Sequence, residues 1–232
     1  MPEITATKTE YICKYCEKAF QRESTLAVHV CEQKRRHQEK NEVGVQIALQ
    51  AYLRFYEITQ GSARLKSFDD FATSPYYRAF VKFGRHCVAI RAINVARFID
   101  WVIQKNKKID HWCHDSVYSE YLLDYLRVES VTDALSRALL ESIAWADETN
   151  CPDRDFLRYG NTNRLCYLVS SGRISPWILY NCESGQHFLD SLNNEQVTMI
   201  WNMIDADFWQ NKFQKYPADR EYCREMLAQA GW

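Results

Sequence analysis

The chain has 232 residues, of which 47% are hydrophobic, 14% aromatic and 25% charged, with only 7 Gly and 5 Pro. This composition excludes a disordered chain, and the shortage of turn-forming residues favours helices over a many-stranded sandwich or barrel. A net charge of −1 excludes nucleic-acid binding by bulk positive charge, so any such binding would have to be local.

The first motif lies near the amino terminus and has the spacing Tyr-x-Cys-x2-Cys-x3-Phe-x5-Leu-x2-His, formed by Tyr11, Cys13, Cys16, Phe20, Leu26 and His29. Two residues between the cysteines bring both thiolates to one metal ion, and the Phe and Leu supply a small core. Over residues 11–37 the chain resembles the C2H2-type zinc finger family, which implies a ββα-like fold around Zn²⁺. We expect zinc binding to supply most of the folding free energy of this finger, on the order of 10 kcal/mol.

The fourth ligand departs from the family pattern, because Gln33, Lys34 and Arg35 occupy the positions where the second histidine is expected. Cys31 and His37 are the candidates, and each requires the helix that carries His29 to end or bend. Thiolate is the softer ligand and a short loop closes more easily, so we prefer Cys31 and keep His37 in reserve.

A polar run without any apolar residue follows at residues 32–41, and it is interpreted as a helical extension or a linker. Its cations Lys34, Arg35 and Arg36 could contact phosphates beside the finger, although a solvated connector is an equal alternative. We divide the chain into a finger (1–37), a polar linker or helical extension (38–44) and a helical domain (45–232). Apolar residues on more than one side of the helix predicted at 43–58 indicate a central element of that domain.

The strongest charge asymmetry lies in residues 76–108, where eight Lys and Arg face one Asp, a net charge of +7. On a helix Arg78, Lys82 and Arg85 share one face, opposite the apolar face formed by Phe80, Phe83 and Cys87. Such a basic face suits contact with phosphates or stacked bases. Residues 110–150 carry nine acids and two arginines, or −7, so pairing between these two segments is an open alternative.

The remaining elements are also predicted to be helical. Ser130 and Asp133 indicate a capping box that opens a helix through Ala146, Asn194 is expected to cap another helix, and Pro217 to open the last one. Because no stretch alternates like a strand for long, the fold class is mostly α: a small ββα-like finger followed by an all-α multi-helix domain.

Two further segments carry alternatives. Residues 164–181 permit a helix-turn-helix with the turn at Gly172 and the second helix opening at Ser175 and Pro176, against an ordinary helical hairpin. Residues 110–115 contain Asp, His and Cys, but their close spacing favours the start of a helix over a second metal site.

Nine cysteines are scattered through the chain, and an odd number cannot all pair. We expect most of them to be reduced thiols that behave as small buried apolar groups, including Cys87, Cys166, Cys182 and Cys223. No signal peptide or membrane span is visible in the sequence. We therefore expect a soluble intracellular protein, cytoplasmic or nucleoid-associated.

No phosphate-binding loop, nucleophile elbow or catalytic zinc motif occurs in the sequence, which weakens an enzymatic assignment. The leading expectation is a zinc-finger nucleic-acid-binding or regulatory accessory protein that contacts DNA or RNA through the finger and the basic helix. A protein-interaction adaptor that docks into a larger assembly is the main alternative. A nucleic-acid-processing enzyme is a weaker one. Beyond the finger, we recognise no family resemblance in the sequence.

Overall fold

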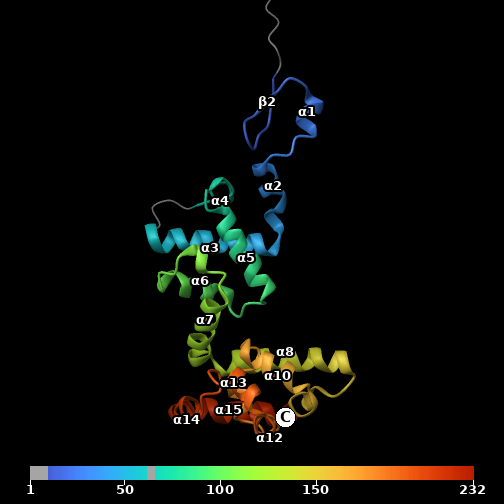
Figure 1. Cartoon of the computed structure of the whole chain (residues 1–232), viewed down its shortest axis with the longest axis vertical. Helices are drawn as coiled ribbons and strands as arrows, with labels where there is room; N and C mark the ends of the chain where they lie inside the picture. Colours follow the sequence, from blue (N-terminus) through green and yellow to red (C-terminus); the bar gives the residue numbers. More distant parts are fainter. Residues whose placement is uncertain (1–9, 62–65) are drawn as a thin grey trace, which may run out of the picture. The chain divides into compact units, whose positions relative to one another are not determined.

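The computed structural model describes residues 10–61 and 66–232, so residues 1–9 of the predicted finger lie outside the described residues. The predicted mostly α fold is confirmed: within the described part, one two-stranded sheet near the amino terminus is accompanied by helices throughout (Figure 1). None of the described helices is long and apolar enough to cross a bilayer. Contacts between residues divide the chain into two compact units, residues 1–114 and residues 115–232, a boundary that was not predicted.

The first unit begins with the finger, which consists of β1 (Tyr11–Ile12), β2 (Ala19–Phe20) and α1 (Glu23–Ala27). The strands are antiparallel, with Tyr11 opposite Phe20. The turn between them has Glu17 in the left-handed region at φ 59°, which lets the chain reverse between the two cysteines and β2. α1 is short and ends at Ala27, before it reaches His29.

The polar run after the finger is helical, forming α2 (Glu32–Gln38) and the 3₁₀ turn η1 (Glu39–Asn41). Cys31 is the N-cap of α2, and its Sγ accepts a hydrogen bond from the Lys34 backbone N–H at 3.4 Å. An acid in the first turn and basic residues in the last turn complement the dipole of α2, which explains why so polar a segment forms a helix.

The body of the first unit contains α3 (Val43–Gln60), α4 (Phe68–Thr73), α5 (Tyr77–Ala89), α6 (Val95–Gln104) and η2 (Ile109–His111). The predicted helix at 43–58 is confirmed and is central, since α4, α5 and α6 all contact it. α5 crosses α3 very closely (Figure 1). The crossing requires glycine, because a Cβ at Gly84 would overlap the carbonyl oxygen of Gly44.

Aromatic side chains fill the core beneath this crossing. Trp112 is fully buried, and its ring centroid lies 5.1 Å from that of Phe83 and 5.9 Å from that of Phe80. The buried residues of α5 are therefore those of the predicted apolar face, and Arg78, Lys82 and Arg85 lie on the exposed side.

The second unit consists of short helices around the long helix α8. Its elements are α7 (Asp115–Val128), α8 (Val131–Thr149), η3 (Asp153–Asp155), α9 (Phe156–Tyr159), α10 (Thr162–Ser170), α11 (Pro176–Leu179), α12 (Glu183–Asp190), α13 (Asn194–Ile200), α14 (Ala206–Lys215) and α15 (Pro217–Gln229). Ser130 caps α8 as predicted, and Pro217 opens α15 as predicted. The cap of α13 is one residue earlier than predicted, because Asn193 forms the capping box with Gln196.

The helix-turn-helix alternative is wrong. Gly172 does form a turn with φ 73°, but the helix after it, α11, has four residues and all of them are buried. A recognition helix must expose a face to the major groove. Segment 164–181 instead contributes to the core of the second unit.

A buried polar network crosses that core. Glu129, whose side chain is fully buried, receives hydrogen bonds from Arg137 at 2.6 Å and from the Ser175 hydroxyl at 2.5 Å. Arg137 also donates to the Gly172 carbonyl at 2.8 Å. The network ties the end of α7 to α8 and to the start of α11.

The cysteines behave as expected, and all nine are free thiols. Cys87, Cys166 and Cys223 are buried and Cys182 is partly buried. Burial raises the pKa of the thiols of Cys87 and Cys223 to about 12 and raises the pKa of the other two. These four thiols are therefore protonated at neutral pH and poorly reactive.

Candidate metal centre and basic groove

Four side chains of the finger converge on one point: Cys13, Cys16, His29 and Cys31. Their ligand atoms all lie within 4.8 Å of one another, with 4.0 Å between the sulfurs of Cys13 and Cys31 and 3.3 Å between Cys16 Sγ and His29 Nε2. A metal ion at about 2.3 Å from each sulfur in a tetrahedral site would place two sulfurs about 3.8 Å apart. The spacing of the four atoms therefore fits a tetrahedral Cys₃His site.

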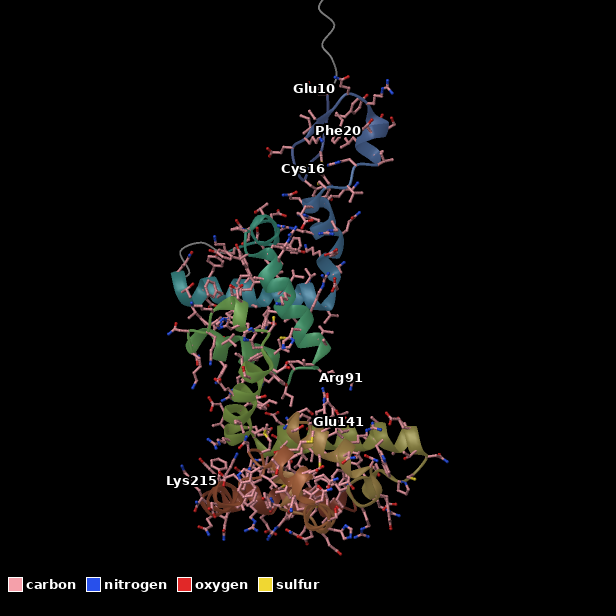
Figure 2. The ribbon with its side chains drawn as sticks, in the orientation of Figure 1. Glu10, Cys16, Phe20, Arg91, Glu141 and Lys215 are labelled. Carbon is pink, nitrogen blue, oxygen red and sulfur yellow. The ribbon has the colours of Figure 1, made fainter. Side chains whose placement is uncertain are left out.

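Each of the four ligands is positioned by local backbone structure. The hairpin turn presents Cys13 and Cys16, where the Cys13 N–H donates to the Lys18 carbonyl at 2.9 Å. His29 follows the end of α1, and Cys31 stands at the start of α2. Figure 2 shows Cys16 at the end of the finger next to α2, and Phe20 between the hairpin and α1.

The finger has almost no core of its own. Of residues 10–42, all of which the structure describes, only Cys13 is buried, at 3% exposure. Phe20 packs on the His29 ring with a centroid distance of 4.7 Å, but it remains partly exposed. Burial of apolar surface alone would not hold this segment together, and a metal ion at the Cys₃His cluster could supply the missing stability.

The two cysteines of the hairpin differ in acidity without a metal. The pKa of Cys13 is lowered, chiefly by a hydrogen bond from the backbone of Tyr15. At Cys16 a backbone hydrogen bond from Lys18 acts in the same direction, but burial and the neighbouring thiols of Cys31 and Cys13 outweigh it and raise the pKa. A thiolate at Cys16 would be repelled by a thiolate at Cys13. A divalent ion that binds all the thiolates at once would offset this repulsion.

His37, the reserve ligand, lies outside the cluster. Its Nδ1 is 2.8 Å from the Gln33 carbonyl and its Nε2 is 3.0 Å from a carboxylate oxygen of Asp69. Its ring also packs against Tyr15 of the finger at 4.9 Å and against Phe68 at 5.3 Å. His37 therefore joins α2 to both the finger and α4, and Cys31 is the residue that completes the four-ligand set.

The basic face of α5 is paired with glutamates from the segment before α3. Arg85 contacts Glu42 at 2.7 Å and Glu39 at 3.3 Å, and Arg78 lies 3.6 Å from Glu32. The sequence left open that the basic segment 76–108 pairs with the acidic segment 110–150. For Arg78 and Arg85 this alternative is wrong, because their partners are Glu32, Glu39 and Glu42. These acidic partners were not predicted, because residues 32–42 were not expected to lie along α5.

The three cations of α2 are placed differently from one another. Lys34 Nζ donates to the His29 carbonyl at 3.0 Å, beside the metal centre, and Arg35 is exposed and pairs with Glu32 at 2.6 Å. Arg36 donates to the Ala72 carbonyl at 2.6 Å, and its guanidinium lies 4.3 Å from the centre of the Tyr77 ring. With a side-chain exposure of 12%, Arg36 fastens α2 to the body of the first unit.

A groove of about 420 Å³ lies between α2 and α5. α2 and η1 contribute Glu32, Arg35 and Glu39, and α5 contributes Tyr77, Arg78, Val81, Lys82 and Arg85. The groove therefore gathers four of the six cations that were predicted to contact nucleic acid. Lys34 lines a different hollow, beside Cys13 and His29.

The second segment with potential ligands, residues 110–115, does not bring three of them together. The rings of His111 and His114 stack at 4.9 Å, and Trp112 is buried in the core. Within residues 10–61 and 66–232, the four finger residues are the only group of at least three potential ligands whose ligand atoms lie close to one another. The preferred interpretation, the start of a helix, is consistent with α7 beginning at Asp115.

Comparison with protein-family models, curated proteins and solved structures finds no match to this chain. The assignment of function therefore rests on the Cys₃His cluster, the groove and the distribution of charge.

Proposed function

We propose that Cys13, Cys16, His29 and Cys31 bind one Zn²⁺ and that the first unit binds DNA or RNA through its phosphates. Three thiolates and one imidazole in tetrahedral geometry match a structural zinc site, which has no open position for catalysis. Reduced thiols throughout the chain also suit an intracellular protein. The protein would then act as an accessory nucleic-acid-binding protein and not as an enzyme.

The distribution of charge between the two units carries this proposal. Residues 1–114 hold 19 Lys and Arg against 12 Asp and Glu, a net charge of +7, whereas residues 115–232 hold 10 against 18, a net charge of −8. Zinc bound by three thiolates would make the first unit only one charge less positive. The overall charge of −1 therefore hides a basic unit that contains the metal centre, and basic patches attract phosphate backbones.

The groove between α2 and α5 is the proposed contact surface, with Arg35, Arg78, Lys82 and Arg85 as phosphate ligands and Lys34 contributing beside the finger. The ion pairs of Arg78 and Arg85 do not argue against this role. Their side chains are 80% and 49% exposed, and exposed pairs contribute about 0–1 kcal/mol. A phosphate that accepts two hydrogen bonds from a guanidinium competes well with such a pair. Arg36 is left out because its contacts are internal.

Retention of mixed-sequence DNA and RNA, single- and double-stranded, at several salt concentrations tests the proposal. The triple variant Arg78→Glu, Lys82→Glu, Arg85→Glu should bind more weakly. The slope of the logarithm of the binding constant against the logarithm of the salt concentration should become shallower by about one for each lost phosphate contact. In a matched control, three cations of the second unit, Arg158, Lys215 and Arg224, are replaced by Glu. This changes the total charge of the protein by the same amount. Equal effects of the two triple variants would contradict a specific role for the groove.

A protein-interaction adaptor is the second candidate, and the surface of the finger favours it. Ile12, Val28 and Val30 are 58%, 78% and 66% exposed. Val28 is the sixth residue counted from the start of α1, a position where base-reading fingers contact DNA. If zinc-loaded protein binds none of the four nucleic acids at low salt, this apolar surface becomes the better guide to function.

A further inference from the structure

The metal centre and the basic groove share one helix. Cys31 contributes a sulfur to the four-ligand cluster, and the same sulfur accepts the Lys34 N–H that caps α2. The next residue, Glu32, lines the groove and lies 3.6 Å from Arg78. Cys31 therefore belongs to the ligand cluster and caps α2, and the residue that follows it, Glu32, forms part of the groove wall.

Other contacts join the finger to α2 from the same side. Lys34 Nζ donates to the His29 carbonyl at 3.0 Å, and the ring of Tyr15, between the two hairpin cysteines, packs on His37 at 4.9 Å. α2 is in turn fastened to the body through Arg36 and Tyr77. None of the residues of α2 is buried, so these polar contacts are its main support.

We infer that metal binding at the Cys₃His cluster assembles the α2–α5 groove, with Cys31 as the ligand that couples the two. Cys13, Cys16 and His29 all precede Cys31 and lie within the finger, whereas Cys31 is also the N-cap of α2. Binding of the metal by Cys31 fixes the first turn of α2 and thereby places Glu32, Arg35 and Glu39 opposite the basic face of α5. Loss of the metal frees this turn and takes away one wall of the groove.

This inference rests on the proposed function for the ligand of the groove, phosphate groups of nucleic acid, but the coupling itself can be measured without nucleic acid. Hydrogen exchange of the α2 amides, residues 32–38, is followed in the full chain with zinc and after chelation. With zinc we expect at least about tenfold slower exchange there, and no change in α8. Equal exchange rates of the α2 amides with and without zinc would overturn the inference.

Two single-ligand variants separate coupling from metal loss. Cys16→Ser at saturating zinc keeps Cys31 as a ligand, so α2 should remain protected. Cys31→Ser keeps an N-cap side chain, since serine is a good cap, but leaves a three-ligand site within the finger, so α2 should lose its protection. Equal protection of α2 in the two zinc-saturated variants would overturn the role of Cys31.

Linkage supplies an independent readout, because two sites that are coupled affect each other equally. If zinc tightens the binding of an oligonucleotide by some factor, the oligonucleotide must tighten zinc binding, measured by competition with a chelating dye, by the same factor. Zinc-dependent protection of α2 combined with no oligonucleotide binding would refute the proposed function and support the coupling. Oligonucleotide binding that is unchanged by chelation would refute the coupling and leave the proposed function standing.

Discussion

Cys31 and His37 lie on the same stretch of chain, but only Cys31 faces the other three ligand atoms. The choice between them could be made from the sequence, because thiolate is the softer ligand and the closer residue needs the shorter loop. The condition that the first helix ends early is met, since α1 ends at Ala27. The polar run was interpreted as a helical extension or a linker, but the cap that Cys31 gives to α2 was not predicted, because the run has no apolar periodicity to mark where a helix begins.

Replacing Cys31 by serine should lower zinc affinity by more than about 100-fold. Loss of a residue that only hydrogen-bonds to a metal ligand already reduces metal affinity by about 10- to 100-fold, and Cys31 is itself a proposed ligand. His37→Ala should leave zinc affinity within about tenfold of the original, since the His37 nitrogens contact Gln33 and Asp69. Competition titration with a chelating dye measures both. A larger loss in His37→Ala than in Cys31→Ser would contradict the assigned fourth ligand.

The buried pair of Arg137 and Glu129 should contribute far more to stability than a surface pair. Arg137→Met leaves a buried carboxylate without its counter-charge and should reduce the free energy of unfolding by about 3–5 kcal/mol. Arg164→Met breaks an exposed pair with Glu148 and should reduce it by at most about 1 kcal/mol. Urea unfolding of both variants measures the difference, and similar losses would show that the Glu129 network is not buried in solution.

Lys212 should give the second unit a pH-dependent stability. Burial lowers the pKa of its ammonium group to about 8, although Glu129 and Asp219 act in the opposite direction. Between about pH 8 and the ordinary value of 10.5 the folded state releases this proton while the unfolded chain keeps it. The free energy of unfolding contributed by Lys212 should therefore rise with pH across this window.

The comparison of wild type with Lys212→Met isolates that contribution. Raised pKa values of Tyr180, Cys182 and Cys223 act in the opposite sense at alkaline pH, but they are common to both proteins. The stability of wild type minus that of the variant should increase from pH 8 to 10.5. A flat difference would show that the pKa of Lys212 is not shifted by folding, and a falling one that folding raises it; either result would contradict the prediction.

The crossing of α3 and α5 should be intolerant of any side chain at Gly84. In a helix, Gly→Ala normally stabilises by about 1 kcal/mol through propensity. At Gly84 the added Cβ would overlap the Gly44 carbonyl oxygen, and overpacking of this kind costs about 1–3 kcal/mol or more. Gly84→Ala should therefore lower the midpoint of thermal unfolding, whereas Lys82→Ala on the exposed face of α5 should leave it nearly unchanged. A more stable Gly84→Ala variant would contradict the close crossing.

Elements with local sequence signals were predicted well. The hairpin follows from the resemblance to C2H2 zinc fingers, and the helix at 43–58, the cap at Ser130 and the opening of α15 at Pro217 follow from periodicity and capping residues. The start of α11 at Ser175 and Pro176 was also predicted, but its length of four residues was not, because only tertiary packing shows that all of them are buried. Helix length and the face that a helix buries depend on neighbours that are distant in the sequence.

The two units of the molecule carry net charges of +7 and −8, close to the +7 and −7 of the segments 76–108 and 110–150. The asymmetry between residues 76–108 and 110–150 was visible, but the boundary at residue 114 was not, because no Gly- or Pro-rich linker marks it. Most of the acids of the second unit lie on exposed helix surfaces. An isolated excess of positive charge in the first unit is what the sequence total concealed.

X-ray absorption at the zinc edge, together with the metal content of the purified full-length chain, is the most direct test of the proposed Cys₃His zinc site. We predict one zinc ion per chain with three sulfur atoms at about 2.3 Å and one nitrogen atom at about 2.0 Å, and one sulfur fewer in Cys31→Ser. A chain that holds no stoichiometric zinc, or a sulfur count that Cys31→Ser leaves unchanged, would contradict it.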